Sequence, residues 1–100
     1  MNTEMKIHNY DKMGSTDKLS FHKAWKAYMD NTNGNEEIFE MGFNPNTGYA
    51  YIALECDIQI ASCFGQEVDF IVTDHENGEE HFFDSYEEAD AKLIRLNELV

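Results

Sequence analysis

Apolar and polar residues alternate through the middle of the chain in the manner of a β-strand. The even positions of this stretch are all apolar: Ala50, Ile52, Leu54, Cys56, Ile58 and Ile60. Because successive side chains of a strand point to opposite faces, the alternation predicts one long strand over residues 50–60, with one buried face and one acidic or aromatic face. Shorter apolar stretches predict three more strands, at residues 36–43, 68–74 and 79–84, and a hairpin turn joins the last two.

Two segments with helical spacing lie before and after these strands. The first, residues 15–34, has cap oxygens at its start and one apolar face that we expect to lie in the core: Phe21, Trp25, Tyr28 and Met29. The second, residues 85–100, begins with a capping box formed by Ser85 and Glu88. A stripe at helical spacing follows the capping box: Tyr86, Ala89, Leu93, Leu96 and Val100.

The resulting order of elements, α-β-β-β-β-α, predicts an α+β fold. In this fold a four-stranded antiparallel sheet is flanked by an N-terminal and a C-terminal helix. At this length we expect a single domain over residues 1–100, in which the weakly patterned residues 1–14 form either a short strand or a loosely ordered arm.

The charge of the chain is strongly negative and unevenly distributed. Twenty acidic residues against seven basic ones give a formal net charge of −13, and residues 27–91 hold sixteen of the acids but no Lys or Arg. This sign disfavours binding to a nucleic-acid backbone or to an anionic membrane. No apolar run approaches the roughly 20 residues of a membrane span, and no signal peptide is evident. We therefore expect a cytoplasmic protein whose two cysteines, Cys56 and Cys63, are reduced thiols.

No motif of enzyme or cofactor chemistry is evident in the sequence. Placing Gly78 or Gly34 at the sixth position of a calcium loop leaves the acidic positions of that loop unfilled. The cysteines and histidines lack the tight pairs that structural zinc uses. Nothing marks a general base or an oxyanion hole for Cys63, and phosphate-binding glycine motifs are missing. We therefore expect no enzyme activity, no cofactor and no metal.

The acidic middle of the chain carries the strongest functional signal. Acids at positions i and i+2 of a strand project from one face, about 6.6 Å apart, and such rows suit a cationic cleft. Tyrosines among carboxylates can stack on and hydrogen-bond to arginines of a partner protein. The candidate partner-binding residues are therefore Tyr49, Tyr51, Glu55, Asp57, Glu67, Asp69, Asp74, Glu76, Glu79 and Glu80.

The end of the chain, HFFDSYEEADAKLIRLNELV, combines a strand with a capped helix. With the charge of −13 over 100 residues, it resembles the small acidic anti-defence proteins of phages and mobile elements. Some of those proteins block CRISPR effectors, restriction enzymes or uracil-DNA glycosylase. The resemblance implies an inhibitor, foremost an anti-CRISPR protein, that occupies the basic nucleic-acid-binding surface of a host defence protein by mimicking the charge of DNA. The alternative that we keep open is an acidic interaction domain of another kind, homodimeric and without mimicry.

Overall fold

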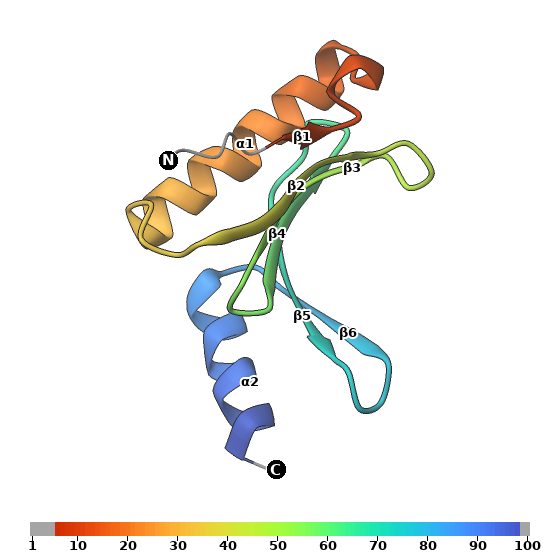
Figure 1. The fold of residues 1–100 in the computed structure, drawn as a ribbon. Coiled ribbons are helices and arrows are strands. Elements are labelled where there is room, and N and C mark those ends of the chain that lie inside the picture. Colours follow the sequence, from red (N-terminus) through yellow and green to blue (C-terminus); the bar gives the residue numbers. More distant parts are fainter. Residues whose placement is uncertain (1–5, 99–100) are drawn as a thin grey trace.

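The fold belongs to the α+β class, as the sequence predicts (Figure 1). The computed structural model describes residues 6–98. Its elements in chain order are β1 (Ile7–His8), a 3-10 turn η1 (Tyr10–Lys12), α1 (Ser15–Thr32), β2 (Ile38–Asn44), β3 (Tyr49–Leu54), β4 (Ile58–Cys63), β5 (Asp69–Asp74), β6 (Glu79–Phe83) and α2 (Tyr86–Glu98). The strands join one sheet in their order along the chain. β1 is parallel to β2, and every later pair of neighbours is antiparallel.

The sheet has six strands and is mixed, so the prediction of four antiparallel strands is wrong in number and in type. One added strand is β1, and the other arises because the predicted strand 50–60 is two strands, β3 and β4, joined by a short turn. In this turn the Asp57 amide donates to the Leu54 carbonyl oxygen at 3.1 Å, and Asp57 has a left-handed backbone with φ of 75°. The turn has an odd number of residues, so even positions stay on the buried face in both strands, and Ile52 pairs directly with Ile60. Alternation alone cannot separate one long strand from such a hairpin.

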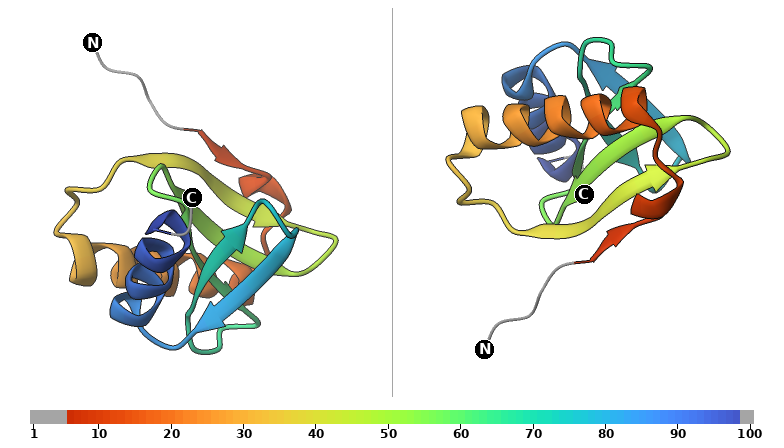
Figure 2. Two further views of the ribbon diagram at one scale, coloured as in Figure 1. Left: turned by 90° about the horizontal axis from the view of Figure 1, so that it is seen from below. Right: turned by 90° about the horizontal axis from the view of Figure 1, so that it is seen from above.

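Both helices cover the same face of the sheet, as the views in Figure 2 show. α1 contacts β3 and β4, and α2 contacts β5 and β6. Between these layers lie several of the most deeply buried side chains: Ala24, Ile52, Ile58, Ile60, Val72 and Ala89. Apolar burial on this one face stabilises the fold and leaves the opposite face of the sheet without a helix.

The face of α1 that meets the sheet consists mainly of small side chains. Ser20 and Ala24 are fully buried, so the helix backbone approaches the strands closely. The Gly65 amide, in the β4–β5 connection, donates to Ser20 Oγ at 2.6 Å. About two turns after Ser20, Tyr28 is buried and its hydroxyl donates to the Glu36 carbonyl oxygen at 2.5 Å. These bonds tie both ends of the helix to the loops beside it.

The predicted core face of α1 is therefore only partly correct. Tyr28 is buried, and Phe21 packs at the edge of the core. Trp25 and Met29, however, are 37% and 40% exposed. The buried stripe of α1 consists of Ser20, Ala24, Tyr28 and Thr32, so it shares Tyr28 with the predicted face and is rotated away from Trp25 and Met29. The small residues Ser20 and Ala24 face the sheet because they let the backbone of α1 come closer to the strands than Trp25 or Met29 would.

The described part of the predicted loose arm is ordered against the sheet. β1 pairs with β2, and the Asn9 side-chain amide donates to the Phe43 carbonyl oxygen at 3.0 Å. Gly42 makes this approach feasible, because a Cβ atom there would lie 2.5 Å from the His8 carbonyl oxygen. The rest of the predicted arm, residues 1–5, lies outside the described residues.

The Ser85–Glu88 pair that the sequence predicts as a capping box does cap α2, with the Glu88 carboxylate bonded to the Ser85 hydroxyl in place of the Ser85 amide. The Glu88 amide donates to Ser85 Oγ at 3.2 Å, and the Ser85 hydroxyl donates to Glu88 Oε1 at 3.3 Å. The predicted stripe packs against the core through Tyr86, Ala89, Leu93 and Leu96, while Val100 lies outside the described residues. Within residues 6–98, neither helix is long and apolar enough to cross a membrane.

Candidate binding face

The candidate site is the face of the sheet that neither helix covers, which we call the open face (Figure 1). Residues paired directly across antiparallel strands point to the same face, so the pairings define its members. They form four rows across the sheet: Tyr49–Cys63, then Tyr51–Ala61–Asp69, then Glu40–Ala53–Gln59–Ile71–Phe82, then Thr73–Glu80. A β-bulge between Ile38 and Glu40 adds Phe39 to the same face.

A small side chain in the middle of the open face makes it hollow. Ala53 lies at the centre, while Phe39 on β2 and Phe82 on β6 stand at the sides, 67% and 53% exposed. The resulting hollow measures about 800 Å³ and extends from the β2–β3 hairpin to β6. In Figure 1 the β2–β3 and β5–β6 hairpins both project on the side away from the helices. The open face is therefore a concave surface between two hairpins.

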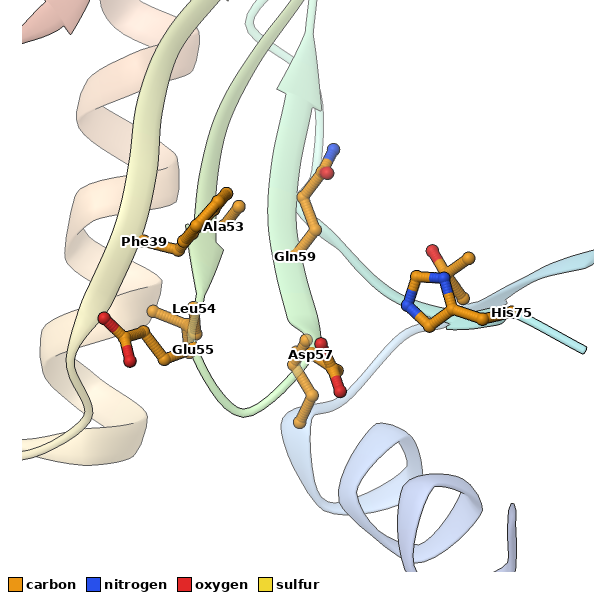
Figure 3. Close-up of a pocket in the computed structure, with 9 residues that line it drawn as sticks. Phe39, Ala53, Leu54, Glu55, Asp57, Gln59 and His75 are labelled. Atoms are coloured by element: carbon orange, nitrogen blue, oxygen red, sulfur yellow. The ribbon is translucent and has the colours of Figure 1, made fainter. Parts of the chain in front are cut away.

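A second hollow of about 550 Å³ continues the open face toward the β3–β4 turn (Figure 3). The two hollows share three lining residues: Phe39, Ala53 and Gln59. In Figure 3 Glu55 and Asp57 lie at the turn, and His75 lies across from them on the β5–β6 hairpin. The carboxylates of the turn thus border the lower end of the open face.

A hydrogen bond fixes one carboxylate of the open face. The Tyr51 hydroxyl donates to Glu40 Oε2 at 2.6 Å. Burial, and secondly the hydrogen bond to the negative charge of Glu40, raise the pKa of Tyr51 from 10.0 to about 12. Tyr51 therefore remains a neutral donor at any ordinary pH. A carboxylate has about four lone-pair sites, so Glu40 keeps the capacity to accept hydrogen bonds from a ligand.

Asp69 is a second carboxylate of the open face with an altered titration. Its burial raises the pKa of the carboxyl group, and repulsion by Asp84 acts in the same direction. The ion pairs among the described residues, Lys26 with Asp30 and His81 with Glu79, do not involve the open face. A cation from outside would therefore relieve repulsion that this part of the chain leaves uncompensated.

The structure brings six of the predicted partner-binding residues to the open face or its rim: Tyr49, Tyr51, Glu55, Asp57, Asp69 and Glu80. Three others lie on the far side of the β5–β6 hairpin. Asp74 and Glu76 line a hollow against α2, and Glu79 pairs with Asp74. The last one, Glu67, precedes β5 and lies near α1, with Lys23 and Lys26 around the same hollow.

The predicted rows of acids at i and i+2 therefore do not form. Glu55 and Asp57 belong to the β3–β4 turn and not to a regular strand. Glu67 lies on the helix side of the sheet, whereas Asp69 lies on the open face. The open face carries a smaller set of carboxylates than the sequence suggests, mixed with aromatic rings.

Three residues of the open face are not among the partner-binding residues predicted from the sequence: Phe39, Glu40 and Phe82. Simple alternation places Phe39 with Met41 and Phe43. The bulge shifts the register, so that Met41 and Phe43 face the helices while Phe39 faces outward. For Phe82 the signal was present, because the strand 79–83 alternates and only one of its two adjacent phenylalanines can face the core.

The strongest grouping of metal-ligand atoms in the described residues is on the β5–β6 hairpin. Asp74, Glu79 and His81 each place one ligand atom within 4.8 Å of the others. Asp74 already accepts hydrogen bonds from the Asn77 side chain at 2.8 Å and from the Glu76 amide at 3.1 Å. These bonds, that from Asn77 foremost, lower the pKa of Asp74 and assign the carboxylate to shaping the turn. Cys63 lies at the opposite end of the sheet from this hairpin.

The arrangement on the open face suits recognition of a cationic group. Aromatic rings and carboxylates line both hollows, and no Lys or Arg of the described residues lines either one. Rings and carboxylates together attract guanidinium and ammonium groups. No family model, curated protein or solved structure matches the chain.

Proposed function

We propose that the protein is a small acidic inhibitor that binds, through its open face, the basic nucleic-acid-binding surface of a host defence protein such as a CRISPR effector. It would act in the cytoplasm of a bacterial host, in the manner of phage anti-defence proteins. The observation that supports the proposal is one concave surface, not covered by α1 or α2, that combines aromatic rings with carboxylates and is lined by no Lys or Arg of residues 6–98. Such a surface is complementary to a cleft lined with Lys and Arg.

The magnitude of the charge decides what kind of mimicry is feasible. The open face and its rim carry five carboxylates: Glu40, Glu55, Asp57, Asp69 and Glu80. A DNA duplex carries about one negative charge per 1.7 Å of axis, so five carboxylates replace roughly 9 Å of duplex. This is a few phosphates and not a whole binding site. Long-range attraction by the net charge of −13 would speed encounter, and desolvated aromatic rings would supply most of the affinity.

Two pairs of charge reversals test the proposal. The readout is cleavage of duplex DNA by a panel of purified CRISPR effectors and restriction enzymes. The protein is expected to inhibit at least one of them, and inhibition should weaken as salt screens the attraction. Glu55→Lys with Glu80→Lys places like charges against the target and should weaken inhibition by at least about tenfold.

The matched control is Glu67→Lys with Glu87→Lys, which changes the net charge equally on the helix side. This variant should inhibit as the unmodified protein does. Equal loss in both variants would show that overall charge matters and the open face does not. Failure of the unmodified protein to inhibit any enzyme of the panel counts against the inhibitor proposal.

A homodimer formed through the open face is the second candidate. The exposure of Phe39 and Phe82 favours it, since large exposed apolar side chains often mark an interface. Light scattering over a range of concentrations distinguishes the two. If the protein dimerises, its measured mass should rise from that of one chain to that of two chains as the concentration increases. The variants Phe39→Asp and Phe82→Asp should keep the mass of one chain at every concentration. The inhibitor proposal predicts the mass of one chain throughout.

A further inference from the structure

The open face repeats one arrangement on two strands, β2 and β6, that lie on opposite sides of its larger hollow. On β2 the exposed residue Phe39 and its sequence neighbour Glu40 both line the larger hollow. On β6 the exposed ring of Phe82 and the carboxylate of Glu80 lie on the same face, two residues apart. All four side chains line the same hollow of about 800 Å³. We call these pairs the β2 wall and the β6 wall.

The walls are separated by a floor of smaller side chains. Ala53, Gln59 and Ile71 lie between them in the row that runs from Glu40 to Phe82. Four strand spacings of about 4.8 Å separate the ends of this row, or roughly 19 Å measured along the sheet. The two walls are therefore distinct sites that face one hollow, and one extended segment of a partner can reach both.

Each wall combines an aromatic ring with a carboxylate, and this combination suits a guanidinium group better than an ammonium group. The guanidinium is planar and weakly hydrated, so it stacks on an aromatic ring while its N–H groups donate to a carboxylate. A lysine ammonium is a compact, strongly hydrated charge that gains little from stacking. On the β2 wall, the bond from Tyr51 at 2.6 Å holds Glu40 in place and leaves lone pairs free for a donor.

We propose that each wall binds one arginine side chain, so that the open face selects arginine-bearing segments of its partner over lysine-bearing ones. This inference rests on the proposed function and names the chemistry of the partner. The occupant is a basic protein segment, because the face is anionic, concave and free of lining cations among the described residues. The ring on each wall supplies the selectivity, and the carboxylate supplies the attraction.

Two peptides of equal length test the proposal, one alternating arginine with serine and the other lysine with serine. Binding is measured by fluorescence anisotropy of the labelled peptides. A cation over an exposed ring contributes enough to tighten binding about two- to fivefold, so two walls should favour the arginine peptide by about tenfold. Phe39→Leu and Phe82→Leu should each weaken binding of the arginine peptide several-fold and leave that of the lysine peptide unchanged.

Phe64→Leu is the matched control for these variants. Phe64 is 68% exposed, close to the 67% of Phe39, but it lies in the β4–β5 connection and lines neither hollow. Its replacement should leave binding of both peptides unchanged. Thermal unfolding of each variant confirms that leucine preserves the fold.

Three results would overturn the inference. Equal affinity for the two peptides would show that the face does not select arginine. If Phe64→Leu weakened binding of the arginine peptide as much as Phe39→Leu or Phe82→Leu does, the walls would have no specific role. Binding of neither peptide removes the site itself. The inhibition assay with the two charge-reversal variants is independent of these peptide measurements. A failure of arginine selectivity is therefore distinguishable from a failure of the proposed inhibitor function.

Discussion

The two sides of β3 differ in what they contribute to the molecule. Ile52 and Leu54 point to the helices and are 0% and 3% exposed, whereas their sequence neighbours Tyr51 and Ala53 line the open face. Packing against α1 constrains the first pair in size and shape. The second pair has no helix to fit and can serve recognition. One strand thus supplies stability from its even positions and a binding surface from its odd ones, and substitutions at adjacent positions should separate the two roles.

The largest expected difference is in stability between truncations at neighbouring positions. Ile52→Ala leaves a cavity beneath α1 and should lower the free energy of unfolding by about 3 kcal/mol. Tyr51→Ala removes a half-buried side chain with one hydrogen bond to Glu40 and should lower it by roughly 1 kcal/mol. Urea unfolding of both variants measures the difference. Equal losses would mean that the open face is also part of the core.

An intermediate difference is expected when two alanines are enlarged. Ala24→Leu adds three heavy atoms at a fully buried contact between α1 and the sheet, and this overpacking should lower the free energy of unfolding by about 1–3 kcal/mol. Ala53→Leu extends into the hollow and should change it by less than about 0.5 kcal/mol. The second variant should nevertheless weaken binding of the arginine peptide, because it fills the space between the walls. Stronger binding by Ala53→Leu would contradict the assignment of the hollow.

The smallest expected effect is on stability at alkaline pH. The pKa of Tyr51 rises from 10.0 to about 12 on folding, so its contribution to stability is complete below pH 10 and is lost as the pH rises through 12. Tyr51→Phe should therefore lose less stability than the unmodified protein between these two pH values. Unfolding curves across this range, with phenolate absorbance as a second readout, provide the comparison. Parallel losses would show that the phenol titrates normally.

The fold class and the outer helices follow from local signals in the sequence. The capping box at Ser85 and the alternation of apolar residues each depend on neighbours a few positions apart, and both predict the right kind of element. The number of strands did not follow, because the β3–β4 turn preserves the alternation across it. β1 contributes only two residues, and it pairs with β2 at Gly42, which lies 34 positions after His8 and so outside any local sequence pattern.

The candidate site was predictable only in its general character. The absence of Lys and Arg from residues 27–91 indicates an anionic surface whatever the fold. Which acids share a face depends on the bulge at Phe39 and on the turn at Asp57, and neither leaves a clear mark in the sequence. Glu67 lies on the helix side of the sheet, near α1. The position of α1 depends in turn on its small buried residues, which contact the sheet. Tertiary contacts therefore set the membership of the site.

The most direct test of the account is amide chemical-shift mapping while the arginine–serine peptide is added to the protein. The account predicts that the largest changes fall on β2, β3 and β6, around Phe39, Tyr51 and Phe82, and that the exposed side of α1 stays unchanged. Chemical-shift changes concentrated in α1 and α2, with none on the open face, would contradict it.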